Sequence, residues 1–169
     1  MADTLSDAER KIESLAGDLS IKTGQQELRG SLNGQNTFNE RRIKQLYADI
    51  SESVKDYLGN ADPARAAEFL AGVNKRHTQA LWPIAHGAFP ALDRLSLAES
   101  SAWLKTTFPD TGNNDQFLVV HNGLSHLLKN PLIRDSLDSE LTRENATVLL
   151  EYPQALQYAA RDVQIGRAH

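Results

Sequence analysis

IKQLYADISESVKDYLGNADP, residues 43–63, carries the strongest structural signal in this chain. Its apolar side chains recur at steps of three and four, as on one face of an α-helix: Ile43, Leu46, Tyr47, Ile50, Val54, Tyr57 and Leu58. Gly59-Asn60 is typical of a helix end. Asp62-Pro63 is typical of a helix start, because an acidic side chain can cap the helix and proline suits its first turn. One helix is therefore predicted to end and the next to begin within a few residues.

The same signals recur in both directions along the chain. Three pairs have the spacing of a capping box, in which two side chains cap the start of a helix: Ser6 with Glu9, Thr37 with Glu40, and Ser96 with Glu99. The first pair begins a stripe of Leu5, Ala8, Ile12, Leu15 and Leu19. Asp62-Pro63 precedes another stripe: Ala66, Phe69, Leu70, Val73, His77, Ala80 and Leu81. We expect the helix that carries this stripe to end at Pro83.

Glycines, amides and prolines divide these helices. Residues 20–36 predict a linker, and residues 83–95 predict an irregular segment. Further helices are expected over residues 96–108, 114–130, 131–141, 143–151 and 153–165. The alternation typical of strands is nearly absent. The sequence predicts an all-α fold, a compact bundle of about seven or eight helices. Residues 1–36 would form an arm with a detachable N-terminal helix, and residues 37–169 an all-helical domain.

Composition excludes several classes of protein. The chain has 169 residues, 40% hydrophobic and 24% charged, which is typical of one globular domain. Its 18 basic and 22 acidic residues give a net charge of −4, which argues against a nucleic-acid partner. No apolar run approaches the ~20 residues of a membrane span. The acidic N-terminus lacks a secretory signal, so we expect a cytoplasmic protein, or one exported by a signal-independent system.

Common catalytic motifs are missing from the sequence. The chain has no cysteine, and therefore no thiolate chemistry, and it has no nucleophile elbow, Walker loop or dinucleotide fingerprint. His121 and His126 are five residues apart and would diverge by about 140° on a helix of 3.6 residues per turn. We therefore expect no metal site and no cofactor, and we lean against an enzyme.

Five residues are candidates for binding a partner or a ligand: His77, Trp82, His86, Phe89 and Trp103. His77 falls on a predicted apolar stripe, where it is either a core histidine or a ligand or pH-sensing group. His86 lies near two aromatic residues in the predicted irregular segment. The aromatic residues are either core or the lining of a partner-binding groove, because such rings favour both places.

One short run suggests different chemistry. Residues 125–132, SHLLKNPL, place His126 five residues before Pro131. This run resembles the H box of histidine kinases, which implies a phosphoaccepting histidine on an exposed helix face. Leu127 departs from the family, which usually has an acid at that position that helps to take the proton. The resemblance covers only eight residues.

Two functions follow as hypotheses. The first is a non-enzymatic helical interaction module, an adaptor, regulator or sensory domain, that binds another protein or itself and can form a homo-oligomer. The alternative is a histidine phosphotransfer or ligand-sensing domain that uses His126.

Overall fold

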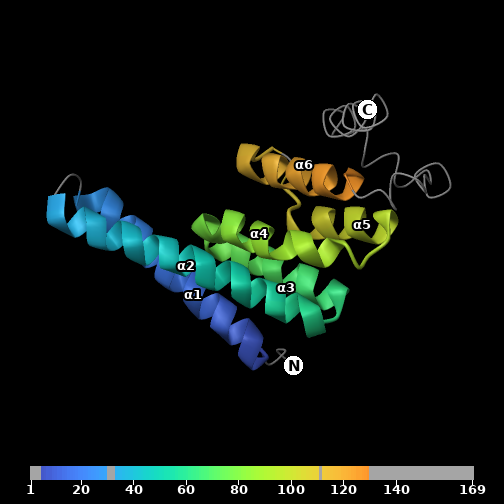
Figure 1. The fold of residues 1–169 in the computed structure, drawn as a ribbon, viewed down its shortest axis with the longest axis horizontal. Coiled ribbons are helices and arrows are strands. Elements are labelled where there is room, and N and C mark those ends of the chain that lie inside the picture. Colours follow the sequence, from blue (N-terminus) through green and yellow to red (C-terminus); the bar gives the residue numbers. More distant parts are fainter. Residues whose placement is uncertain (1–4, 30–32, 111, 130–169) are drawn as a thin grey trace, which may run out of the picture. The chain divides into compact units, whose positions relative to one another are not determined.

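A computed structural model describes residues 5–29, 33–110 and 112–129. All of the secondary structure in these residues is helical, so the all-α prediction is confirmed. The elements are α1 (Asp7–Arg29), α2 (Asn33–Asn60), α3 (Pro63–Arg76), the 3-10 turn η1 (Thr78–Ala80), α4 (Leu81–Leu92), α5 (Leu97–Thr107) and α6 (Asn114–Leu128) (Figure 1). The described part has six α-helices. The helices predicted beyond residue 130 lie outside the described residues, so the total of seven or eight stays a prediction.

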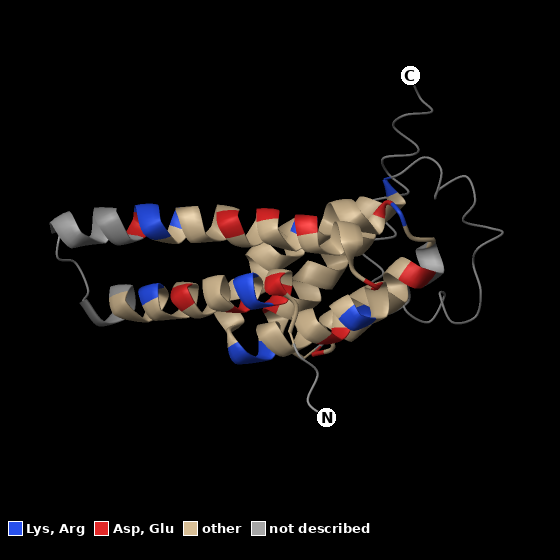
Figure 2. Cartoon of the chain, turned by 90° about the horizontal axis from the view of Figure 1, so that it is seen from below, with Lys and Arg blue, Asp and Glu red and all other residues tan. Residues whose placement is uncertain are grey.

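The chain divides into two compact units, residues 1–90 and a second unit that begins at Ala91. In the first unit, α1 and α2 run antiparallel and side by side (Figures 1 and 2). Charged positions of both signs occur along the two helices (Figure 2). The predicted boundary at residues 36 and 37, and the detachable arm that it implies, stay predictions.

The core of the first unit lies along the α1–α2 hairpin. Residues at steps of three and four are fully buried on both helices: Ile12, Ala16 and Leu19 on α1, and Leu46, Ile50 and Val54 on α2. Each buried leucine or isoleucine contributes about 1.5–3 kcal/mol relative to its exposed state. Ala8, expected on the stripe of α1, is exposed, whereas Glu9 is buried.

The linker predicted over residues 20–36 is wrong at the positions that the structure describes, 20–29 and 33–36. α1 continues to Arg29 and α2 begins at Asn33, so Thr37 lies inside a helix instead of at its start. Glycine lowers helix propensity by only about 1 kcal/mol per residue. Packing of the two helices along the hairpin outweighs that cost, because tertiary contacts supply most of the stability of protein helices.

The irregular segment predicted over residues 83–95 is also wrong over most of its length, because α4 continues to Leu92. Pro83 is the third residue of α4, where a backbone N–H would have no partner within the helix. Pro90 lies in the last turn of α4. Helix α3 ends before the proline, at Arg76, and η1 separates it from α4.

Other predicted helix ends are confirmed. Ser6 and Glu9 form both bonds of a capping box, as do Ser96 and Glu99. The Asp62 carboxylate accepts a hydrogen bond from the Arg65 backbone N–H at 3.1 Å. α2 ends at Asn60, as Gly59-Asn60 predicts.

A close contact joins α4 to α2. A Cβ atom at Gly87 would overlap the Ser51 carbonyl oxygen and lie 2.9 Å from Val54 Cβ. The Ser51 hydroxyl donates a hydrogen bond to the Pro83 carbonyl at 2.9 Å. The backbones of the two helices therefore approach more closely than any side chain at position 87 would allow.

In the second unit, α5 and α6 contribute a separate set of buried residues. These are Trp103, Leu104 and Phe108 around α5, and Val119, Val120, Leu124, Leu127 and Leu128 on α6. The Trp103 and Phe108 rings meet edge to face, with centroids 6.4 Å apart. Among the helices described, none combines the length and hydropathy that crossing a bilayer requires.

Candidate functional site

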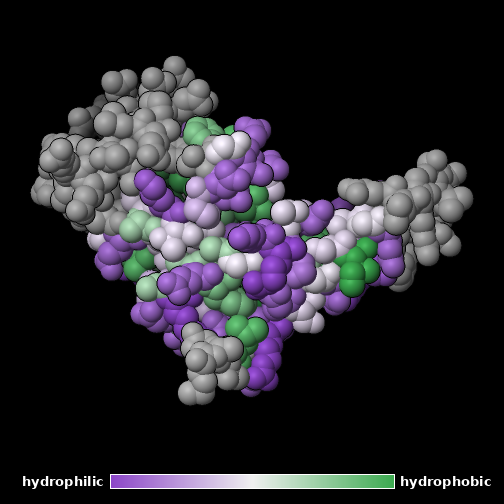
Figure 3. All heavy atoms as spheres, turned by 180° about the vertical axis from the view of Figure 1, so that it is seen from behind, coloured by the Kyte–Doolittle hydropathy of each residue, from purple (hydrophilic) through white to green (hydrophobic). Residues whose placement is uncertain are grey.

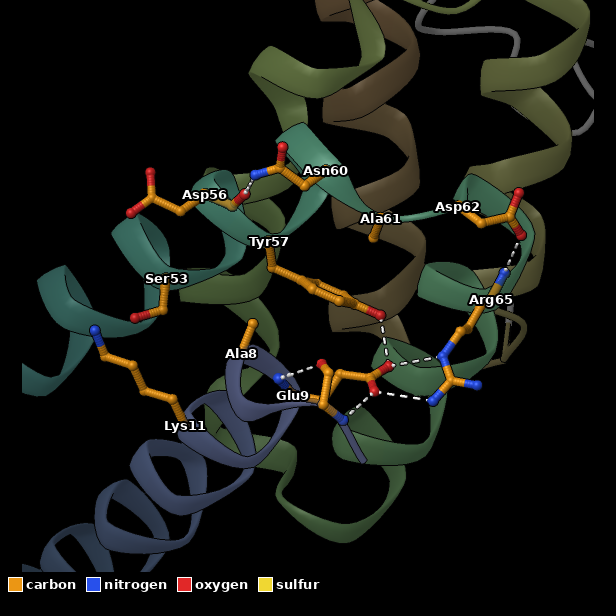
Figure 4. Close-up of a pocket in the computed structure, with 11 residues that line it drawn as sticks. Ala8, Glu9, Lys11, Ser53, Asp56, Tyr57, Asn60, Ala61, Asp62 and Arg65 are labelled. Carbon is orange, nitrogen blue, oxygen red and sulfur yellow. Dashed lines mark hydrogen bonds and ion pairs between the residues drawn. The ribbon is translucent and has the colours of Figure 1, made fainter. Parts of the chain in front are cut away.

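A buried carboxylate joins three helices of the first unit. Glu9, in the first turn of α1, is 1% exposed. It accepts hydrogen bonds from the Tyr57 hydroxyl of α2 at 2.7 Å and from the Arg65 guanidinium of α3 at 3.0 and 3.3 Å. It also accepts the Ser6 backbone N–H at 2.9 Å as part of the capping box (Figure 4). The charge is therefore hydrogen-bonded from several sides, as a buried ion requires.

These contacts decide the ionisation of both acidic groups. Burial raises the pKa of the Glu9 carboxyl, but the hydrogen bonds from Arg65, Ser6 and Tyr57 outweigh it and lower the pKa from 4.5 to about 2. Burial and the hydrogen bond to Glu9 raise the pKa of Tyr57 above its ordinary value. Glu9 is therefore an anion, and Tyr57 a neutral donor, at neutral pH.

A pocket of about 510 Å³ opens beside this network (Figure 4). Its lining comes from the start of α1, the end of α2, the α2–α3 corner and α3: Ser6, Ala8, Glu9, Lys11, Ser53, Asp56, Tyr57, Asn60, Ala61, Asp62 and Arg65. The Tyr57 ring runs across the pocket, with Lys11 and Ser53 at one end and Asp62 and Arg65 at the other (Figure 4). The pocket thus has charged groups at both ends, with the Tyr57 ring and the Glu9 carboxylate between them.

His77 belongs to a second polar cluster in the first unit. It is the C-cap of α3 instead of a member of the helix stripe, and its side chain is 22% exposed. Its Nδ1 lies 3.2 Å from the Ser20 hydroxyl and its Nε2 lies 3.3 Å from a Glu13 carboxylate oxygen. Arg76 donates two hydrogen bonds to the same carboxylate, at 2.9 and 2.8 Å. The Arg76 hydrogen bond is the main cause of a lowered pKa of Glu13, which burial opposes.

The residue types of this cluster match a hydrolase triad, but its setting does not. Ser20 lies inside α1, where backbone N–H groups bond within the helix and offer no oxyanion donors. We therefore assign His77 and its neighbours to holding α1 against the end of α3.

The predicted aromatic candidates separate into two places. Trp82, His86 and Phe89 lie four and three residues apart on α4. Their ring centroids are 5.9 Å apart between Trp82 and His86, and 6.3 Å apart between His86 and Phe89. His86 is exposed, and its two neighbours are half-buried. Trp103 is 6% exposed and packs within the second unit, against Phe108.

His126 lies on α6, and its side chain is 39% exposed. Its Nε2 is 3.1 Å from a carboxylate oxygen of Asp93, which precedes α5 in the same unit. Pro131, the other half of the predicted motif, lies outside the described residues.

Sequence reasoning missed the site at Glu9, which it treated only as half of a capping box. A signal was available, because Glu9 lies three residues before Ile12 on the face that continues through Ala16 and Leu19. Nothing in the sequence identified Tyr57 or Arg65 as its partners, which are about fifty residues away.

Three further observations concern the exposed surface, metal binding and similarity to known proteins. Among the described residues, the exposed large hydrophobic side chains are Ile21 and Leu118, and Figure 3 shows hydrophobic residues in small groups among hydrophilic ones. No group of three or more acidic or histidine side chains in the described part could hold a metal ion. Comparison with protein families, curated proteins and solved structures found no match.

Proposed function

We propose that this protein is a non-enzymatic helical interaction module that binds another protein, or a second copy of itself, through the aromatic face of α4. We define this face as Trp82, His86 and Phe89. The observation that supports the proposal is the contact of three rings along one side of a helix, with the central ring exposed. Aromatic residues of this kind are enriched where interfaces bind most strongly.

A different side of α4 is buried. Leu81, Ile84, Ala85 and Ala88 are buried and form a different stripe of the helix. Gly87 brings α4 close to α2, so the helix is held firmly on that side. A rigid helix that presents aromatic rings loses little conformational entropy when a partner binds. The rings also combine apolar area with the polar imidazole of His86, which suits a partner that has both kinds of group.

The test uses the full chain with a photocrosslinking amino acid at position 86. Sedimentation at increasing concentration measures self-association, and crosslinking followed by mass spectrometry identifies any partner. Replacing both Trp82 and Phe89 by alanine should abolish the crosslink and any self-association. The matched control is Ile21→Ala, which removes an exposed apolar side chain elsewhere. If association and crosslinking are unchanged in the double variant, and circular dichroism shows it folded, the proposal is wrong.

A second candidate function rests on the His126–Asp93 pair. We propose His126 as a phosphoacceptor, because a carboxylate at 3.1 Å can take the role of the acid that Leu127 does not supply. If Nε2 donates its proton to Asp93, the lone pair lies on Nδ1. That nitrogen attacks phosphorus and forms an N–P bond, while the donor's bond to its leaving group breaks.

Phosphoramidate is a suitable donor, since its leaving group is ammonia. Incubation with labelled phosphoramidate should give an acid-labile label on the wild type and none on His126→Gln. Asp93→Asn should slow the labelling, and His121→Gln serves as the control on the same helix. Equal labelling of the wild type and His126→Gln would exclude His126 as the acceptor.

A further inference from the structure

We propose that the pocket beside Glu9 binds a small zwitterion, a molecule whose carboxylate and ammonium are separated by a short apolar chain. Its volume of about 510 Å³ is within the range of small-molecule sites, roughly 300–1,000 Å³. It lies wholly within the first compact unit. The site is independent of the aromatic face of α4.

The base of the pocket is rigid before any ligand arrives. Glu9 and Tyr57 are 1% and 7% exposed, and their hydrogen bond is 2.7 Å long. Arg65 adds two bonds to the same carboxylate from a third helix. A wall that is fixed by buried hydrogen bonds lowers the entropy cost of binding.

The charges in the lining select the class of ligand. Arg65 and Glu9 neutralise each other as an ion pair at 3.0 Å. Of the other charged residues in the lining, Lys11 and Asp56 lie at one end of the pocket and Asp62 lies at the other (Figure 4). A pure anion would be attracted by Lys11 and repelled by the two aspartates. A pure cation would be attracted by the two aspartates and repelled by Lys11. A molecule that carries both charges gains from each.

Each end of such a ligand has a contact of opposite charge in the lining. Lys11 and Ser53 lie at the same end of the pocket (Figure 4). Within the described part of the chain, Lys11 has no ion pair, and the hydroxyl of the largely buried Ser53 has no hydrogen bond. These two donors fit a carboxylate. Asp62 lies at the opposite end and fits the ammonium, because only one of its oxygens is used by the cap of α3. Ala8, Ala61 and the Tyr57 ring line the space between.

Three probes of equal chain length test the proposal by nuclear magnetic resonance titration of the labelled full chain: ε-aminocaproate, caproate and hexylammonium. All three share the apolar body and differ only in charge. We expect aminocaproate to bind about two- to fivefold more tightly than either singly charged probe, the ratio that partly exposed ion pairs give. Amide shifts should concentrate on the residues that line the pocket. Equal affinity for the three probes, or shifts spread elsewhere, would refute the proposal.

Two variants test the contacts at the two ends of the pocket separately. Lys11→Gln should weaken aminocaproate and caproate but not hexylammonium, whose ammonium Lys11 repels. Asp62→Asn should weaken aminocaproate and hexylammonium but not caproate, whose carboxylate Asp62 repels, while asparagine retains the helix cap. Lys44→Gln, an exposed lysine of α2 outside the lining, is the control. If both pocket variants bind every probe as the wild type does, the pocket is not the site.

Discussion

Glu9 shows how much structure one side chain can organise. The same carboxylate caps α1 through Ser6 and bonds to Tyr57 of α2 and Arg65 of α3. A buried ion pair is costly to desolvate, and removing one partner leaves the other charge uncompensated. Three helices therefore depend on the ionisation of a single residue.

This dependence predicts how stability changes with pH. The folded-state pKa of Glu9, about 2, is below its ordinary value of 4.5, so the stabilisation is complete above the ordinary value and is lost as pH falls towards 2. The shift corresponds to about 3 kcal/mol of unfolding free energy, at 1.36 kcal/mol per unit. Urea unfolding at a series of pH values should show a shallower acid loss in Glu9→Gln. Part of the loss should remain, because the pKa of Glu13 is also lowered.

Glu52→Gln is the control for this experiment. Glu52 is exposed on α2 and should keep the acid dependence of the wild type. An acid loss in Glu9→Gln as steep as that of the wild type would show that Glu9 does not couple protonation to folding.

Two glycines give opposite predictions for the same substitution. Gly24→Ala should raise stability by up to about 1 kcal/mol, because alanine favours helix and nothing lies within 4 Å of the added Cβ. Gly87→Ala should lower stability by about 1–3 kcal/mol. The cost of overpacking the added methyl group against Ser51 and Val54 exceeds the gain in helix propensity. Chemical denaturation of the two variants measures both effects. A stabilised Gly87→Ala would mean that α4 is not held against α2 as described.

Helix ends are the features of each element that local sequence specifies best. Ser96, Glu99 and Asp62 cap α5 and α3 as their spacing predicts, because the bonds involve residues only three apart. The capping box predicted at Thr37 does not begin a helix, because α2 begins four residues earlier, at Asn33. The sequence predicts a helix end at Pro83 and an irregular segment over residues 83–95, yet Pro83 and Pro90 both lie within α4, near its ends. Local signals therefore fail where tertiary contacts extend a helix past them.

The capping box of α5 can be tested directly. Ser96→Ala removes the side-chain acceptor of the Glu99 N–H and should cost about 0.5–2 kcal/mol. Trp103 fluorescence in a Trp82→Phe background reports on the unit that contains α5. Thr106→Ala, at an exposed position of the same helix, should change stability little. Equal effects of the two substitutions would contradict a role for the cap.

Over the whole molecule, fold class follows from sequence but the candidate site does not. Periodicity identifies the helices and their buried faces, as the stripe of Leu46, Ile50 and Val54 shows. The contacts of Glu9 with Tyr57 and Arg65 join residues about fifty positions apart, and no local pattern encodes them. The same holds for His126 and Asp93.

The division into two units predicts that residues 1–90 fold alone. This fragment contains the hairpin core, the Glu9 network and the contact of α4 with α2. Its amide resonances should overlay those of the same residues in the full chain. A collapsed, poorly dispersed spectrum would contradict the prediction. A fragment of residues 37–169 tests the alternative of a detachable arm, which requires that this fragment keep its native spectrum without α1.

Pro90 is the last residue of the first unit, within the final turn of α4. Because proline has no amide hydrogen, the carbonyl of His86 lacks its usual helical partner, and the hydrogen-bond ladder of α4 is weaker by one bond at that point. In hydrogen–deuterium exchange, α4 should therefore behave as two segments. The amides before Pro90 should be protected by their contacts with α2, and those after it should exchange with the kinetics of the second unit.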